Sequence, residues 1–456
     1  MRSLFPPIVP ARAVFICIAL AVMIATPCLA APKASPAPAA QKSPAEAAAT
    51  AKPAPPAPPG PEVDTLYIPD LIAPEEEQAE RRFHFEKDIT LEEGPDIEMR
   101  FGDTMKPFVM AKPKERPEFG FGLSGSFDRV DGLSIFCHQE FKSDSTLYPS
   151  VQLMEGYAFD GEHWRYRFKF EQPLFRPEFF SFGAALYLLT DTYDGDISGV
   201  VENSITALCL KHDYRDYFER EGGLVFVKQK FWGDNTVTLQ YAEDTHRSLE
   251  TKSKGLFHRH SREFRPNPAV DEGKWATVTG VYEFDSRDGD GYEAGTQRYR
   301  LYYEKGQNKD AEDVSDTEYT RLAADLRTYM FMSPGQYLNV RLTAGSTVSG
   351  TLPFQREFYA GGLSTLNALS YKEFRGDQLL LANVEYLFDI AKWGQFVVFV
   401  DAGKAWYEWD RLKDQRMEFD VGIGLGNEEG FRLCVAKDPR DEDSDPVWIL
   451  RLQRPF

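Results

Sequence analysis

The sequence predicts an all-β fold: a transmembrane antiparallel β-barrel of sixteen strands. Three observations predict it. Aromatic residues make up 14% of the chain, yet past the N-terminus no run of about 18 apolar residues could form a transmembrane helix. From residue 116 onward, apolar and polar residues alternate in segments of strand length. The connections between these segments tend to be alternately short and long, which is typical of barrels that cross a membrane.

The first 30 residues have the pattern of a secretory signal peptide. Arg2 and Arg12 supply its positive charge, and a short apolar core is followed by a small-residue cleavage site ending at Ala30. We therefore expect residues 1–30 to be removed from an exported protein. Of five cysteines, Cys17 and Cys28 leave with the signal, and the odd number that remains does not indicate a disulfide framework.

Two segments separate this signal from the predicted barrel. Residues 31–62 contain 12 Ala and 10 Pro, and we expect a disordered linker because so little apolar surface cannot support a core. Residues 63–115 are acidic and interrupted by proline. They are expected to form a short periplasmic segment, and residues 116–456 the barrel.

Period-two alternation defines the strands of the barrel. In residues 163–170 every aromatic side chain falls on one face and every basic side chain on the other. The expected strands are 117–127, 132–142, 148–160, 163–172, 179–189, 222–231, 236–246, 275–286, 297–305, 318–332, 336–347, 376–388, 395–402, 417–426, 430–437 and 446–456. A soluble sandwich has no reason to sort its connections by length, so we expect a membrane barrel with its long loops outside.

One long connection is predicted to contain a helix at residues 201–219. Ile205, Leu208, Cys209 and Tyr217 lie near helical spacing, and Gly222-Gly223 would end the helix. We interpret it as a cap over the barrel mouth.

The last predicted strand carries an assembly signal. Trp448, Leu450, Leu452 and Phe456 share one parity, and Phe456 ends the chain. This pattern resembles the C-terminal signal of outer-membrane barrels, which implies recognition by the barrel assembly machinery during insertion.

Residues 354–409 contain motifs in a fixed order. A Gly-Gly turn is followed by an Asn-x-Glu-Tyr stretch and an F-x-D-x-G motif. The motif residues are Gly361, Gly362, Glu385, Phe399, Asp401 and Gly403. The stretch resembles the BamA/TamA outer-membrane assembly superfamily, also called bacterial surface antigens. The resemblance implies that the sixth outer loop folds into the lumen, where an arginine at its tip bonds carboxylates of the wall.

The chain departs from that family at two points. Asn367 stands where the loop arginine would be, so we expect Asn367, or Arg375 further along, to bond Glu385 and Asp401. The residues before 116 leave no room for a POTRA module, the periplasmic domain of family members. The resemblance therefore implies a barrel-only member.

The resemblance implies a protein in the outer membrane of a Gram-negative-type bacterium, surrounded by outer-membrane lipid and lipopolysaccharide. It would work in outer-membrane biogenesis or in translocating a polypeptide or lipid, although the sequence does not identify the substrate. Two alternatives stay open: a passive or substrate-selective pore, and a structural surface antigen without transport.

Other chemistry finds little support in the sequence. The formal charge of −19 argues against a nucleic-acid partner, which needs a basic surface. The acidic stretches 191–196, 288–293 and 438–445 lack the full calcium-loop spacing, and His258 and His260 have no third ligand nearby. We expect no enzymatic activity, no cofactor and no metal.

Overall fold

A computed structural model of the chain describes residues 118–142, 148–174, 179–231, 234–255, 263–287, 295–311, 317–390, 394–408, 415–427, 431–441 and 443–452. The predicted signal peptide, linker and periplasmic segment lie outside the described residues, as do Phe456, His258 and His260.

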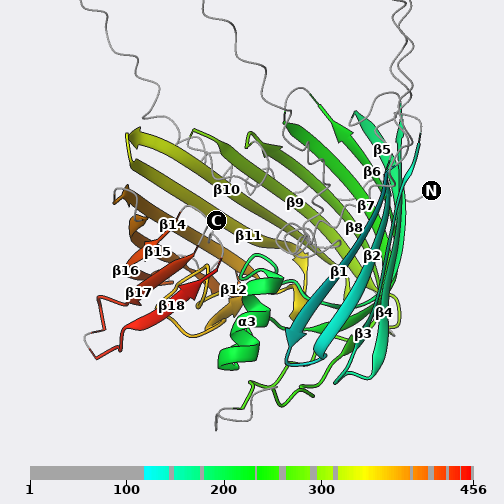
Figure 1. The fold of residues 1–456 in the computed structure, drawn as a ribbon, viewed down its shortest axis with the longest axis horizontal. Coiled ribbons are helices and arrows are strands. Elements are labelled where there is room, and N and C mark those ends of the chain that lie inside the picture. Colours follow the sequence, from blue (N-terminus) through cyan, green and yellow to red (C-terminus); the bar gives the residue numbers. More distant parts are fainter. Residues whose placement is uncertain are drawn as a thin grey trace, which may run out of the picture. The chain divides into compact units, whose positions relative to one another are not determined.

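Sixteen antiparallel strands form one sheet, in which each strand pairs with its neighbours in the chain (Figure 1). They are β1 (Glu118–Asp128), β2 (Gly132–Lys142), β3 (Ser150–Ala158), β4 (His163–Leu174), β5 (Phe180–Asp191), β6 (Phe218–Lys230), β7 (Asn235–Ser248), β8 (Gly273–Asp285), β9 (Gln297–Asn308), β10 (Tyr319–Ser333), β11 (Gln336–Gly350), β14 (Gln378–Asp389), β15 (Gln395–Trp406), β16 (Glu418–Gly426), β17 (Arg432–Lys437) and β18 (Val447–Arg451). Each overlaps one expected strand, which confirms the predicted fold and strand number. Within the described residues, β1 and β18 are the two ends of the sheet order.

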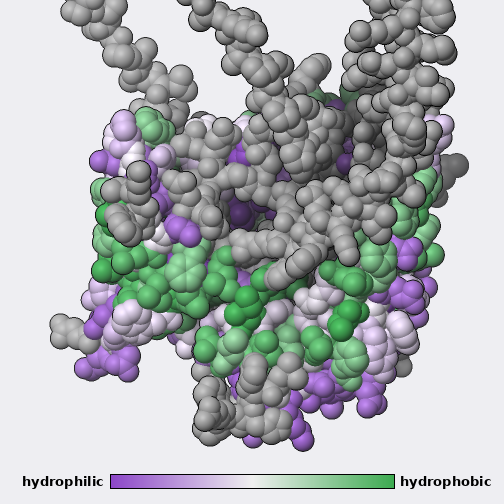
Figure 2. Space-filling view, in the orientation of Figure 1, coloured by the Kyte–Doolittle hydropathy of each residue, from purple (hydrophilic) through white to green (hydrophobic). Residues whose placement is uncertain are grey.

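The two faces of the sheet have inverted polarity compared with a soluble protein. On β4, Trp164, Tyr166 and Phe168 are exposed, whereas the basic residues between them are buried. A soluble protein places its charges outside, but a barrel in lipid turns its apolar face outward. Hydrophobic residues accordingly cross the visible face of the protein as a band (Figure 2). The barrel therefore spans a membrane with its strands.

The predicted helix is present but shorter than expected. Helix α3 covers Val200–Leu210 and ends at Lys211, whose φ of 56° is left-handed. The chain after it has no regular secondary structure up to residue 217, where buried side chains bond its backbone N–H groups: Asn203 Oδ1 accepts from the N–H of Tyr214 at 2.8 Å. Among the described residues, no helix is long and apolar enough to span a bilayer.

The prediction that Gly222 and Gly223 end this helix was wrong. Both lie inside β6, opposite Asp244 and Glu243 of β7. A Cβ on Gly222 would lie 2.2 Å from the carbonyl oxygen of Glu243, so the glycine permits a close approach of two strands. The interpretation of α3 as a mouth cap is also corrected, because α3 lies beside β1 and near the end of β18 (Figure 1).

Candidate functional site

The connection between β11 and β14, residues 351–377, folds back toward the inner face of the sheet; we call it loop six. It contains a short 3-10 helix, η3 (Phe354–Arg356), and a two-stranded sheet of β12 (Phe358–Ala360) and β13 (Phe374–Gly376). Strand β12 lies against β14 and β15. The tip of loop six, residues 361–373, therefore reaches the inner wall of the barrel.

Gly361 and Gly362 open the tip of loop six. Their φ angles are 116° and 85°, a region that residues with a Cβ rarely adopt. A Cβ on Gly361 would also lie 2.5 Å from the carbonyl oxygen of Ser370. The turn is closed by a 2.9 Å bond from the N–H of Gly362 to the carbonyl of Leu366. Glycine is needed here for both conformation and space.

Three polar residues of the wall lie side by side under this tip. Asn383 of β14 is the Cα partner of Asp401 of β15, which is in turn the partner of Asp420 of β16. Their exposed fractions are 2%, 2% and 0%. Because these side chains are out of contact with water, each needs a hydrogen-bond partner within the protein.

Loop six supplies donors to both carboxylates. The Asn367 amide donates to Asp401 at 2.7 Å, and the N–H of Ala368 donates to Asp420 at 2.9 Å. Asn383 Nδ2 completes the group, because it donates to Asp401 at 2.7 Å and to the carbonyl of Thr365 at 2.8 Å. Among the described residues, no cation forms an ion pair with Asp401 or Asp420. At these two carboxylates loop six is held by neutral donors, whereas Ser364 of the same tip accepts bonds from Arg341 and Arg451 of the wall.

The other two residues expected at this contact lie elsewhere. Glu385 bonds Arg432 at 3.0 Å and Asn339 at 3.3 Å, so the wall itself neutralises it and loop six is not needed. Arg375 does not replace the missing arginine. It bonds Asp216 at 3.1 Å and stacks on Phe354, because β13 holds it away from the tip.

A second contact joins loop six to the connection between β5 and β6, residues 192–217. Lys372 Nζ lies 2.7 Å from Asp194 and 2.8 Å from Asp216. Burial alone would raise the pKa of the Asp216 carboxyl, but the cations of Lys372 and Arg265 hold that pKa well below its usual range. Sequence reasoning missed this contact, because these loops have no periodicity from which to place a side chain.

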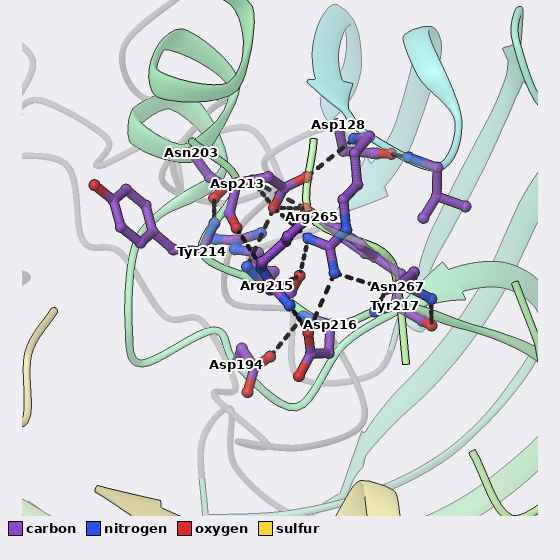
Figure 3. Close-up of polar contacts among 12 residues, drawn as sticks. Asp128, Asp194, Asn203, Asp213, Tyr214, Arg215, Asp216, Tyr217, Arg265 and Asn267 are labelled. Carbon is purple, nitrogen blue, oxygen red and sulfur yellow. Dashed lines mark hydrogen bonds and ion pairs between the residues drawn. The ribbon is translucent and has the colours of Figure 1, made fainter. Parts of the chain in front are cut away.

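Asp216 also belongs to a network of outer connections (Figure 3). Arg129, in the turn between β1 and β2, lies 3.3 Å from Asp213 and 3.2 Å from Asp216 and donates to Asn267 at 2.9 Å. Arg265, from the connection between β7 and β8, pairs with Asp216 as well. Three connections and loop six therefore share one buried charge network.

The predicted assembly signal lies on the outer face of the last strand where it is described. Trp448 and Leu450 are 70% and 37% exposed, whereas Ile449 between them is buried. Leu452 is half-buried.

Within the described residues, no group of three or more His, Cys, Asp or Glu side chains could hold a metal ion.

A sixteen-stranded barrel with an apolar outer face and an outer loop folded onto carboxylates of its wall defines a class of protein, the outer-membrane β-barrel with an inserted loop. The sequence matches the Omp85 superfamily domain over residues 152–433, which is more than half of the chain. The chain belongs to the Omp85 superfamily.

One solved structure agrees with this fold. BamA from Haemophilus ducreyi lacking POTRA domains 1–3 matches with a TM-score of 0.50 and 13% identity, over 74% of this chain and 69% of that one. CdiB from Acinetobacter baumannii matches with a TM-score of 0.38 and 12% identity, over 75% of this chain and 60% of that one. CdiB from Escherichia coli matches with a TM-score of 0.40 and 10% identity, over 75% of this chain and 68% of that one. No curated protein matches the sequence significantly.

Proposed function

We propose that this protein resides in the outer membrane of a Gram-negative bacterium and promotes insertion or translocation of a polypeptide or lipid substrate, with loop six as the moving part. The carrying observation is the bond from Asn367 to Asp401, in a member of the Omp85 superfamily. Outer-membrane lipid and lipopolysaccharide would surround the barrel, and the barrel assembly machinery would insert it. We expect no enzymatic activity.

The bonds at Asp401 and Asp420 support a tip that can leave this part of the wall. A neutral amide that donates to a carboxylate contributes about 1.5–3 kcal/mol, whereas a guanidinium that bonds a carboxylate adds its own charge and a second parallel bond. Asp401 and Asp420 receive their bonds from amides of loop six and Asn383. Such bonds can be exchanged for bonds to water or to a substrate at a smaller cost than an arginine fork. The inserted loop would thus occupy the lumen at rest and leave it during activity.

A two-part measurement on the full chain in vesicles of outer-membrane lipid tests this function. The first part follows the folding rate of an unfolded small outer-membrane barrel added to the vesicles, and the second follows ion conductance. We expect faster folding of the added barrel than in empty vesicles, and a lower rate with Asn367→Arg. If the added barrel folded no faster with the wild-type chain or with Asn367→Arg than in empty vesicles, an insertion role would be contradicted.

A selective pore is the second candidate, favoured by one observation. A cavity lies between loop six and the wall, lined by charged side chains that include Asp194, Arg321, Asp325, Arg341 and Lys372. A pore would conduct steadily without affecting the added barrel. A structural surface antigen would do neither, so the two parts separate all three functions.

A further inference from the structure

Helix α3 buries its polar face and exposes its apolar one. Glu202, Asn203 and Thr206 are 1%, 2% and 3% exposed, whereas Ile205 and Leu210 are 41% and 48% exposed. A helix on the surface of a soluble protein has the opposite arrangement. The exposed face, which we call the α3 face, also includes Val201, Leu208 and Cys209.

Contacts attach α3 to both ends of the sheet order. The hydroxyl of Ser204 accepts a 2.9 Å bond from the N–H of Phe127 in β1. On the other side, Glu202 accepts bonds from Arg451 Nε of β18 at 2.9 Å and from the N–H of Leu452 at 2.8 Å. The helix is therefore fixed beside β1 and the end of β18, where the described strands do not pair with each other.

The contact between Glu202 and Arg451 is well satisfied. Arg451 is 4% exposed, and besides Glu202 it donates to the hydroxyl of Ser364 in loop six at 2.6 Å and to the carbonyl of Ile197 at 3.2 Å. A buried ion pair persists when further hydrogen bonds satisfy its remaining donors. This network determines which face of α3 turns inward.

The α3 face continues the apolar outer surface of the barrel. On one side β1 exposes Phe119, Phe121 and Leu123, and on the other β18 exposes Trp448 and Leu450. Figure 2 shows hydrophobic residues across the region where α3 lies, joining the two sides. In water, an exposed apolar patch of this extent would be unfavourable, but next to acyl chains it is favourable.

We propose that α3 is a membrane-facing element of the barrel wall at the seam between β1 and β18, and that the α3 face contacts the hydrocarbon of the bilayer. The polar residues of α3 then take the place that lumen-facing side chains hold on a strand. This inference rests on the barrel fold and not on the proposed insertion activity.

Fluorescence quenching at Cys209 tests the proposal in the full chain, reconstituted in phospholipid vesicles. Cys137→Ala and Cys434→Ala leave Cys209 as the single thiol of the mature chain for a small fluorophore. Two matched variants carry Cys209→Ala as well: Leu123→Cys on the outer face of β1 as the lipid control, and the exposed Glu250→Cys in the connection after β7 as the water control. Folding is checked by heat-modifiable migration on gels.

We expect spin-labelled lipids to quench the Cys209 probe as strongly as the Leu123→Cys probe, and aqueous iodide to quench it several-fold less than the Glu250→Cys probe. Quenching that follows the water control would overturn the proposal, as would a probe that neither quencher reaches, since another part of the protein would then cover α3. If the label disturbs folding, Ile205→Cys in the same Cys209→Ala background is a second reporter on this face.

Discussion

The amide nitrogen of Asn367 lies 2.7 Å from a carboxylate oxygen of Asp401, at a contact where no cation of the described chain neutralises the acid. Asp420 lies directly across on the neighbouring strand, and one of its oxygens has no hydrogen-bond partner. Two buried carboxylates with only neutral donors are costly. A positively charged side chain at position 367 of loop six should therefore bind Asp401 more strongly than Asn367 does.

Asn367→Arg should stabilise loop six by about 1–3 kcal/mol, as bonds to charged groups do. The new guanidinium would reach Asp401 and offset the repulsion between the two acids. The measurement is the rate of protease cleavage in loop six, together with the temperature of gel-migration change. Asp401→Asn in the same chain should abolish the gain, and an equal gain with and without Asp401 would show that the arginine acts elsewhere.

Lys372→Met should loosen the outer connections by about 3–5 kcal/mol, because it leaves Asp194 buried without a cation among the described residues, although Asp216 keeps its arginine partners. The matched control is Lys305→Met, since Lys305 pairs with Glu318 on the exposed surface and such pairs contribute about 0–1 kcal/mol. Hydrogen exchange of residues 192–217 measures the difference. Equal exchange in the two variants would mean that the buried pair is not what holds this connection.

Acidification should release the same network. The pKa of Asp216 is lowered in the folded protein, so this carboxylate stabilises the network above its unfolded pKa of about 4 and the contribution is lost as the pH falls through the lowered value. Protection of residues 192–217 should thus be full at neutral pH and decline below about pH 4. Asp216→Asn should be less protected at neutral pH and should flatten this decline; an unchanged decline would assign it to another group.

The barrel could be predicted from sequence because the alternation of apolar and polar residues within each strand shows which side chains share a face. Alternation placed Trp164, Tyr166 and Phe168 on the lipid side, and all sixteen expected strands overlap observed ones. The candidate site was predictable only in part. That Asn383, Asp401 and Asp420 form a row depends on the register between strands, which turns and packing determine and local periodicity does not.

The missed contacts involve long connections. Lys372 meets Asp194, 178 residues away in sequence, and no spacing rule links two irregular segments. The helix was predicted too long because Tyr217 fell near helical spacing, whereas in the fold its N–H bonds Asn267 of another connection. Gly222-Gly223 was interpreted as a helix stop because glycine gives the same signal at a helix end and at a close approach of strands.

Removal of Phe456 should reduce the amount of barrel in the outer membrane. The assembly signal remains a prediction, supported by the outward position of Trp448 and Leu450. A strand that is not recognised leaves the barrel unfinished, with edges open to proteases. The measurement is the level of folded protein in outer-membrane fractions, with Pro455→Ala as the control. Normal levels after removal of Phe456 would rule out a signal at this residue.

Glu202→Gln should loosen α3 from β18 while leaving the strands in place. The substitution keeps the shape of the side chain but removes its charge, so the guanidinium of Arg451 stays buried with only neutral acceptors, Ser364 and Ile197 among them. Breaking one side of a buried pair costs about 3–5 kcal/mol, and we expect the Cys209 probe to become several-fold more accessible to iodide. Glu250→Gln removes the same charge from an exposed position and should change nothing. Adding Arg451→Met to Glu202→Gln should restore part of the attachment, because neither side of this contact then carries a buried charge. A double variant looser than Glu202→Gln alone would show that Arg451 holds α3 through Ser364 and Ile197 and not through Glu202.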